Sequence, residues 1–248
     1  MQAPPDVRQY LFAGTQHTPG ALPPPREDPN TGGRGLQRFN VVDYAPLLRA
    51  ALVNLDRWVK DGVAPPPSAV PRLADHTAVP HESLEKVFVT IPGVRFPDHI
   101  ERPMRLDFGP DWAHTATLPP KTGAAYSTFV SAVDADGNEV AGIRPVEVAV
   151  PLATLTGWNP RHPEQGAPGD IMSMMGSTLP FARTREERAR GGDPRPAVAE
   201  RYVSRDDYLA RVRTAAETLV SARHMLAEDV DAVVARAGRQ WDLIQEGL

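Results

Sequence analysis

The clearest hydrophobic period of the chain lies between residues 44 and 62, where apolar side chains recur at helical spacing. Asp43 and Gly62 are suitable residues for the two ends of a helix. The apolar stripe consists of Leu48, Ala51, Leu52, Leu55, Trp58 and Val59. The pattern therefore predicts a helix over Tyr44–Asp61 whose stripe needs a sheet or another helix to cover it.

A shorter run of β-forming residues, Val7–Ala13, precedes this helix and predicts one buried strand. Gly14 breaks the run, and His17 follows at the C-terminal end of the predicted strand. Enzymes with α/β folds keep catalytic groups on loops at this end of a strand. His17 is therefore the candidate catalytic residue, and the alternative interpretation is a surface histidine that caps a turn.

A long irregular loop, Thr18–Val42, follows the histidine and is rich in proline and glycine. Loops of this length in a compact domain are usually functional or disordered. Two interpretations remain open, a loop on the substrate side of His17 and a surface linker. Phe39 and Asn40 are the residues that we expect to anchor its far end.

Alternating apolar residues in the middle of the chain predict short strands at Glu85–Ile91 and Met104–Phe108. The run Asp134-Ala-Asp-Gly-Asn138 between two alternating segments indicates a hairpin turn rather than a calcium loop. Pro145–Leu155 adds a third strand-like run, so we expect a small antiparallel meander between Arg105 and Leu155. Trp158 follows it, and the pattern favours a core position over a substrate platform.

The C-terminal region shows two further helical periods. Ser204 followed by Asp207 resembles a capping box at the start of the first. The apolar stripes are Leu209, Val212, Ala216, Leu219 and Val220, then Val230, Val233, Val234, Ala237, Trp241 and Ile244. These patterns predict an antiparallel helical hairpin, and Thr184–Arg190 predicts a short charged helix before it.

The sequence Phe-Ala-Gly-Thr-Gln-His at Phe12–His17 resembles the last strand and catalytic-histidine loop of the α/β-hydrolase superfamily. More narrowly, the chain resembles the C-terminal part of a bacterial family known as "alpha/beta hydrolase domain-containing protein". Further runs that carry this resemblance are Val63–Pro71, Val133–Arg144, Glu147–Asn159, Pro180–Glu187 and Gly192–Tyr202. In addition, Leu55–Pro65 is similar to the closing helix of tannase-like esterases. The resemblance implies an ester hydrolase in which His17 is the general base.

The nucleophile of such hydrolases sits in a Gly-x-Ser-x-Gly elbow that precedes the histidine, and no such motif occurs in these 248 residues. We therefore interpret the chain as an α/β-hydrolase C-terminal portion, with Met1 as an internal methionine or the start of a split frame. Residues 1–65 would hold the last sheet strand and closing helix of the hydrolase core. Residues 66–248 would form an α+β extension with the small antiparallel meander and the C-terminal helical hairpin.

This interpretation makes the chain inactive alone and assigns it two partners: the upstream N-terminal half of the hydrolase and, in the complete enzyme, a small ester substrate. The alternative is a non-enzymatic split or degenerate hydrolase chain that acts as a binding or interaction module. Ser173 and Ser177 do not lie in a strand–elbow–helix context and are rejected as nucleophiles.

Composition and charge exclude several kinds of partner and active site. The formal net charge is −4 with both signs spread along the chain, so we expect no nucleic-acid partner. No run is apolar enough for a membrane span, and no signal peptide is visible, although the parent protein could be exported. With no cysteine, thiolate catalysis and disulfides are excluded. His76 and His81 do not have a recognised zinc spacing, so we expect no metal and no cofactor.

Overall fold

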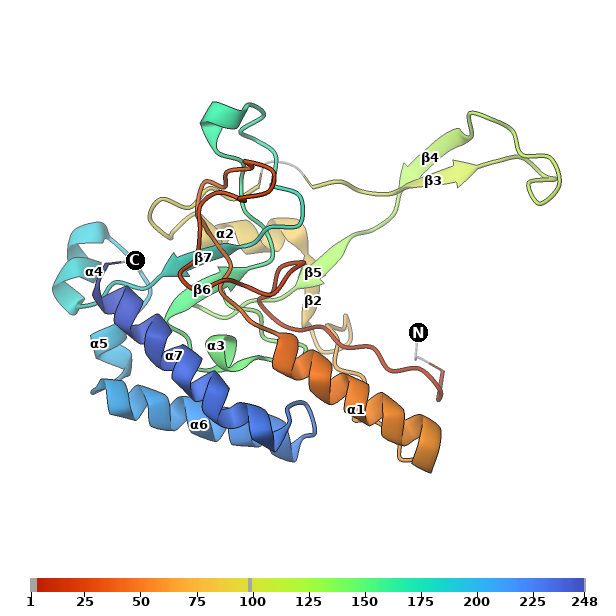
Figure 1. Ribbon diagram of the computed structural model, residues 1–248. Helices are drawn as coiled ribbons and strands as arrows, with labels where there is room; N and C mark the ends of the chain where they lie inside the picture. Colours follow the sequence, from red (N-terminus) through yellow and green to blue (C-terminus); the bar gives the residue numbers. More distant parts are fainter. Residues whose placement is uncertain (1–3, 98–99, 248) are drawn as a thin grey trace.

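The computed structural model describes residues 4–97 and 100–247, so Met1 lies outside the described residues (Figure 1). The strands are β1 (Arg38–Phe39), β2 (Ala78–Pro80), β3 (Met104–Asp107), β4 (Lys121–Ala125), β5 (Phe129–Ser131), β6 (Ala153–Thr156) and β7 (Ser177–Pro180). The helices are α1 (Ala45–Asp61), α2 (Glu85–Phe88), α3 (Val146–Ala149), α4 (Arg185–Gly191), α5 (Val198–Arg201), α6 (Arg205–Ser221) and α7 (Val230–Gln245). Short 3₁₀ turns occupy His81–Leu84, Pro163–Gln165 and Ala227–Asp229.

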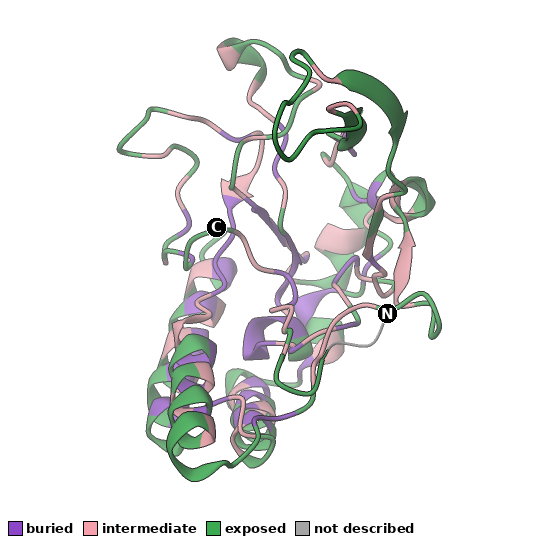
Figure 2. Cartoon of the chain, turned by 90° about the vertical axis from the view of Figure 1, so that its right-hand side faces the viewer, coloured by how far each residue is buried: buried purple, intermediate pink, exposed green. Residues whose placement is uncertain are grey.

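The described part of the chain has an α+β fold with small antiparallel sheets. The order β1-β7-β6 forms the central sheet, and the pairs β2-β5 and β3-β4 form two more. The predicted meander between Arg105 and Leu155 is therefore wrong as a single unit, because its strands belong to three sheets. Figure 2 shows β6 and β7 among the buried residues of the interior, whereas the projecting β3-β4 pair is exposed throughout.

Two predicted strands are helical in the structure. Glu85–Ile91 contains α2, and Pro145–Leu155 begins with α3 before β6 starts. Short apolar runs cannot be assigned to helix or strand from their pattern alone, which explains both errors. In α3 the buried Val146 and Val148 pack into different apolar clusters, so a helical turn serves both clusters at once.

Other predicted elements are confirmed. β3 occupies the predicted strand at Met104–Phe108, and an antiparallel bridge between Val133 and Glu139 closes the predicted hairpin turn. The side chain of Thr184 caps α4 by accepting from the Glu187 N–H. Both predicted long-helix regions form as expected, with α1 over Ala45–Asp61 and the α6–α7 hairpin at the C-terminus.

The largest core cluster lies between the α6–α7 hairpin, α3 and the N-terminal end of α1. Tyr208 is almost completely buried there, and its ring stacks on Trp241 at 5.2 Å between ring centroids. Ser204 caps α6 by accepting from the Asp207 N–H at 3.1 Å, while the Asp207 carboxylate accepts from Val203. The capping box is thus half formed, and the hairpin is fixed mainly by its apolar stripes.

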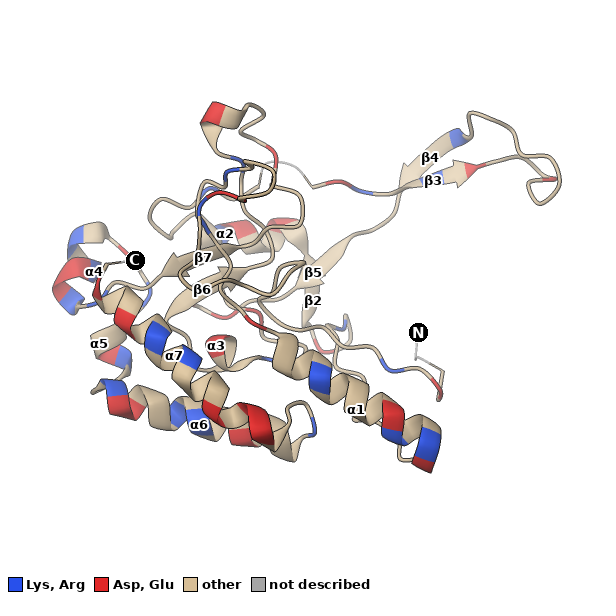
Figure 3. Ribbon diagram, viewed as in Figure 1, with Lys and Arg blue, Asp and Glu red and all other residues tan. Residues whose placement is uncertain are grey.

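Charge is dispersed over these elements. In the view of Figure 3, basic and acidic residues are interspersed along α1, α6 and α7. No helix in residues 4–97 and 100–247 combines the length and hydropathy needed to cross a bilayer.

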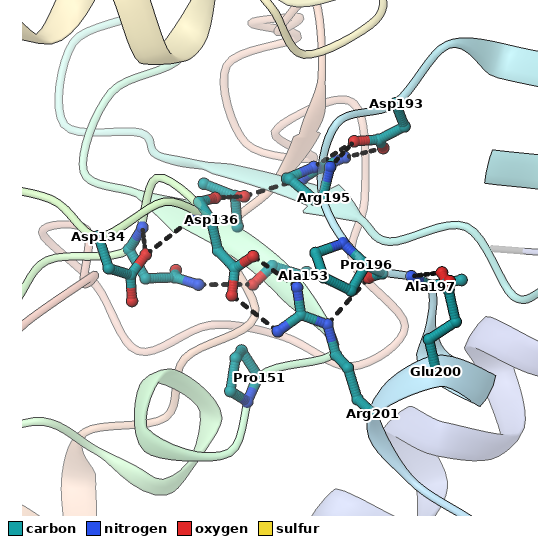
Figure 4. A network of polar contacts seen from close by, with 12 residues as sticks. Asp134, Asp136, Pro151, Ala153, Asp193, Arg195, Pro196, Ala197, Glu200 and Arg201 are labelled. Atoms are coloured by element: carbon teal, nitrogen blue, oxygen red, sulfur yellow. Dashed lines mark hydrogen bonds and ion pairs between the residues drawn. The ribbon is translucent and has the colours of Figure 1, made fainter. Parts of the chain in front are cut away.

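A buried arginine joins the central sheet to the segment before α5 (Figure 4). The Arg195 side chain is 3% exposed and forms an ion pair with Asp193 at 2.7 Å. Its guanidinium also donates to the Thr154 hydroxyl on β6 at 2.8 Å and to the Leu179 carbonyl on β7 at 2.9 Å. Arg195 therefore ties two strands and one loop together from inside the protein.

A second arginine extends this network to the hairpin turn. Arg201 of α5 pairs with the Asp136 carboxylate at 2.5 Å, and its guanidinium lies 4.1 Å from the centroid of the Phe181 ring. The guanidinium of Arg195 lies 5.0 Å from the centroid of the same ring. The turn that the sequence identified is thus anchored by a residue that lies 65 positions later in the chain.

The Arg195 network yields a stability prediction. Arg195→Ala should lower the free energy of unfolding by about 3–5 kcal/mol, because it leaves the Asp193 carboxylate buried and unpaired. Denaturant unfolding followed by circular dichroism measures this loss. Arg190→Ala, on the exposed surface of α4, is the matched control and should change the stability little. Equal stability of both variants would contradict the importance of the network.

Candidate functional site

The segment that leads to His17 is extended but is not a strand of a larger sheet. The Leu11 N–H donates to the Ala69 carbonyl, and the Ala69 N–H donates to the Gln9 carbonyl, both at 2.9 Å. Further along, Ile143 donates to Leu11 at 2.7 Å and accepts from Ala13 at 2.9 Å. The predicted strand Val7–Ala13 is therefore not formed as a strand: the segment pairs only through isolated parallel bridges at Tyr10 and Phe12, because it meets Ala69 and Ile143 of two different loops.

The predicted burial of Val7–Ala13 is only partly correct. Ala13 is fully buried and belongs to an apolar cluster with Val41 and Leu155, whereas Val7 is exposed. Burial of the segment therefore increases from Val7 to Ala13, toward the histidine.

Gly14 turns the backbone at the end of this segment with a φ of 66°, a conformation that favours glycine. Its N–H donates to the Glu139 carboxylate at 2.6 Å, and its carbonyl accepts from the Asn40 amide at 2.7 Å. The side chain of Thr15 donates back to the Phe12 carbonyl at 2.7 Å. The turn before His17 is thus fixed by its own residues and by two distant side chains.

The backbone of His17 is held on both sides. Its N–H donates to the Met174 carbonyl at 3.2 Å, and its carbonyl accepts from the Tyr44 hydroxyl at the start of α1. Next to it, the Gln16 side chain accepts from the Gly176 N–H at 2.9 Å. The His17 residue itself is exposed, so a fixed backbone presents an imidazole that is open to solvent.

A hollow of about 450 Å³ lies beside this histidine. Residues of the proline-rich loop and of the connection between β6 and β7 line it: His17, Thr18, Asp28, Thr31, Gly33, Arg161, Gln165, Met172, Ser173, Met174 and Met175. Met174 has a φ of 65°, which is uncommon for a residue with a side chain. Part of the loop Thr18–Val42 therefore lies beside the histidine, through Thr18, Asp28, Thr31 and Gly33.

The loop is anchored at the residues expected. Asn40 is fully buried, and its amide also donates to the Thr156 carbonyl on β6 at 2.9 Å. Its side-chain oxygen accepts from the Val42 N–H at 2.8 Å. Asn40 therefore connects the far end of the loop to Gly14 and to the central sheet.

Glu139 is the acid that lies against the turn before His17, and its carboxylate accepts from the Gly14 N–H. Burial raises the pKa of its carboxyl, and the hydrogen bond from Gly14 opposes that rise. Through this hydrogen bond, Glu139 stabilises the turn at Gly14. Its position was missed by sequence analysis, because only the folded chain brings residues 14 and 139 together.

The other candidate residues are placed apart from this turn. The ring of His81 stacks on Phe96 at 4.6 Å between centroids, and Asp75 bonds to Thr77. No group of three or more His, Cys, Asp or Glu side chains in the described part of the chain could hold a metal ion. Trp158 is partly buried and packs edge-on against Phe88 at 5.1 Å, at the edge of an apolar cluster.

Of the two rejected serines, Ser177 is buried in β7 and donates to the Trp158 carbonyl at 2.8 Å. Ser173 does line the hollow beside His17, but it lies in an irregular connection without the strand–elbow–helix geometry. The described residues therefore bring one histidine to the hollow and no elbow serine.

A second cavity, of about 180 Å³, holds the most perturbed acid. Glu147 is buried at the start of α3, and burial raises its pKa from 4.5 to about 7. Arg236 of α7 lies 4.0 Å away and partly offsets the burial. This cavity and the hollow beside His17 have no lining residue in common, so Glu147 is not placed to orient the histidine.

Comparison with known proteins adds one finding to this geometry. A family model described as an alpha/beta hydrolase domain matches residues 2–235 of the chain. No curated protein and no solved structure matches it.

The anchoring role of Asn40 is testable. Asn40→Ala should lower the free energy of unfolding by about 2–5 kcal/mol, because buried carbonyls of Gly14 and Thr156 lose their donor. Asn30→Ala, on the exposed part of the same loop, should leave the stability nearly unchanged. Urea unfolding measures both, and a loss no larger than that of the control would contradict the role.

The pKa of Glu147 predicts a pH dependence. Because its folded pKa of about 7 lies above the unfolded value, the native state binds more protons between these values, and stability falls as the pH rises through them. Glu147→Gln lacks this loss, so its stability relative to the wild type should increase by about 3 kcal/mol from pH 4 to pH 8. Glu164→Gln on the exposed surface is the control for unfolding at both pH values, and a flat difference for Glu147→Gln would refute the assignment.

Proposed function

Because the chain belongs to the alpha/beta hydrolase domain family, we propose that it supplies the general-base histidine of a serine ester hydrolase. His17 has this role, and the serine nucleophile and the orienting carboxylate come from a part of the hydrolase that these 248 residues do not contain. Residues 1–65 complete the hydrolase core in this proposal, and residues 66–248 form the extension that wraps it.

The observation that carries the proposal is the presentation of His17. A general base must reach the proton it removes at about 3 Å, so its backbone has to be fixed while its ring stays accessible. The backbone N–H of His17 donates to Met174, and its carbonyl accepts from the Tyr44 hydroxyl. The residue is exposed beside the hollow. In a histidine that only capped a turn, a ring nitrogen would form the capping hydrogen bond.

The chemistry follows from the role of the imidazole. His17 takes the proton of the serine hydroxyl as the serine oxygen attacks the ester carbonyl carbon, and then gives that proton to the departing alcohol. In the second half the imidazole takes a proton from water, whose oxygen attacks the acyl-enzyme, and returns it to the serine. Each half transfers one proton out and one back, so the histidine ends unchanged.

The extension contributes the position of the base and one wall of the hollow. Glu139 of the extension fixes the Gly14 turn together with Asn40 of the proline-rich loop. The three methionines Met172, Met174 and Met175 line the hollow and are flexible apolar side chains that adapt to an acyl or alkyl group. These features support a small ester as the substrate.

The test is reconstitution with a serine-bearing polypeptide. We define this polypeptide as the part of the same hydrolase that contains Gly-x-Ser-x-Gly and ends before Phe12–His17, taken from the adjacent upstream frame or from a family member. The chain alone should not hydrolyse small activated esters above the buffer rate. Together with the serine-bearing polypeptide it should, and His17→Ala should reduce kcat/KM by about 10³–10⁶-fold.

The controls are His76→Ala and His162→Ala, which remove histidines outside the hollow and should change the rate little. Circular dichroism should show the same fold for all three variants. A reconstituted enzyme that keeps its rate without the His17 imidazole, or a complex that forms and has no activity, would overturn the proposal.

A further inference from the structure

Several polar side chains in the hollow beside His17 are already hydrogen-bonded within the protein. The Gln165 side-chain oxygen accepts from the Arg34 N–H, and its nitrogen donates to the Gly32 carbonyl, both at 2.6 Å. Gln165 thus joins the short 3₁₀ turn at its end to the proline-rich loop. Its amide acts as a link between two walls of the hollow.

Asp28 is the acid among the residues that line the hollow, and its own loop uses it. One carboxylate oxygen accepts from the Asn30 N–H and the other accepts from the Thr31 hydroxyl, both at 2.9 Å. The hydrogen bond from Asn30, followed by the one from Thr31, lowers the pKa of the Asp28 carboxyl. Asp28 therefore keeps a fixed negative charge at one side of the hollow.

Arg161 differs from these residues because part of its guanidinium is free. Its Nε donates to the Gly166 carbonyl at 3.2 Å, and its Nη2 donates to the Gln165 carbonyl at 3.1 Å. A guanidinium has five N–H groups, so these two bonds leave three, including both on Nη1. In the described part of the chain Arg161 forms no ion pair, whereas Arg34 pairs with Glu164 at 2.7 Å. Because Arg161 lines the hollow, its remaining donors are available to a molecule bound there.

The position of this guanidinium is set before anything binds. The Arg161 N–H donates to the Asp170 carbonyl at 2.9 Å, and an antiparallel bridge joins the residue to Gly35 of the proline-rich loop. The side chain is half-buried and is fixed by the two carbonyls at its tip. A fixed guanidinium loses little conformational freedom when it binds a ligand, and its planar fork matches a carboxylate.

We propose that Arg161 binds a free carboxylate of the substrate, so that the hydrolase acts on esters that carry one negative charge. This inference rests on the proposed function for the reaction and adds the substrate class. His17 and Arg161 line the same hollow, and its volume of about 450 Å³ is typical of pockets that bind small organic molecules. A substrate that fills the hollow therefore contacts the imidazole and the guanidinium at the same time.

A carboxylate fits this hollow better than a phosphate monoester does. A phosphate monoester carries about 1.5 to 2 negative charges at pH 7, and Arg161 supplies one positive charge. Asp28 in the same hollow repels the excess negative charge. Met172, Met174 and Met175 give apolar contacts to the chain that joins the ester to the carboxylate. The expected substrate is thus a monoanionic ester with a short apolar chain.

The first test measures binding to the isolated chain by NMR. Monomethyl glutarate has one ester and one carboxylate, and it should shift the Arg161 Nε–H resonance in a saturable titration with a Kd on the order of millimolar. Dimethyl glutarate, which lacks the charge, and inorganic phosphate should bind at least about tenfold more weakly. Arg26→Gln, at an exposed arginine of the proline-rich loop outside the hollow, should bind like the wild type. A titration without saturation, or equal binding of either comparison compound, would overturn the proposal.

The second test measures specificity after reconstitution with the serine-bearing polypeptide. The mono-4-nitrophenyl ester of glutaric acid and 4-nitrophenyl pentanoate differ by a carboxylate on the acyl side. 3-Carboxyphenyl butyrate and 3-carbamoylphenyl butyrate differ in the same way on the alcohol side. In at least one pair, Arg161→Gln should lower kcat/KM for the charged ester by about 10- to 100-fold and leave the neutral ester nearly unchanged.

Arg26→Gln makes the same change in net charge and should not alter either pair. Arg161→Lys keeps the charge but not the planar fork, so its loss should be smaller and confined to the same charged ester. Because Arg161 also bonds to Gly166 and Gln165, circular dichroism is compared for all variants. An equal loss for the charged and the neutral ester would show a merely structural role. That result, or no loss in either pair, would contradict the carboxylate site.

Failure of the carboxylate site and failure of the catalytic proposal have different signatures. Saturable binding of monomethyl glutarate without histidine-dependent activity would refute the function and retain the site. Histidine-dependent activity whose preference does not respond to Arg161→Gln would refute the site and retain the function.

Discussion

The structure around His17 depends on the pairing of Gln9–Ala13 along one edge. Ala69 and Ile143 fix the direction of this segment, and Glu139 and Asn40 then fix the turn at Gly14. All four partners lie outside the segment, and three of them come from residues 66–248. Residues from the later part of the chain, Ala69, Glu139 and Ile143, therefore help to position the segment that leads to His17.

Features that depend on one long amphipathic period could be predicted from sequence. The helices α1, α6 and α7 follow from local spacing, and so do Gly62 after α1, Ser204 before α6 and the Asp134–Asn138 turn, whereas Tyr44 and not Asp43 precedes α1. Glu85–Ile91 and Pro145–Leu155 failed because a short apolar run fits either a helical turn or a strand. The position of α1 was predicted correctly, but its covered face was not: α1 buries Pro46, Leu47, Ala50 and Asn54, whereas Leu48, Leu52, Leu55 and Val59 of the predicted stripe are exposed.

The features that sequence analysis missed are all long-range contacts. Arg195 has no distinguishing local pattern, and its importance comes from meeting β6 and β7 inside the protein. Glu139 and Glu147 are ordinary acids in the sequence and become unusual through burial. His17 was selected from a sequence motif, whereas its exposure and the hollow beside it could be known only from the fold.

The central claim is that the nucleophile served by His17 belongs to another part of the hydrolase. An organophosphonate that reacts with activated serines, followed by mass spectrometry of the labelled peptides, tests this claim most directly. The label should appear on the elbow serine of the serine-bearing polypeptide, and the isolated chain should stay unlabelled. Labelling of Ser173, the serine that shares the hollow with His17, in the isolated chain would contradict the account.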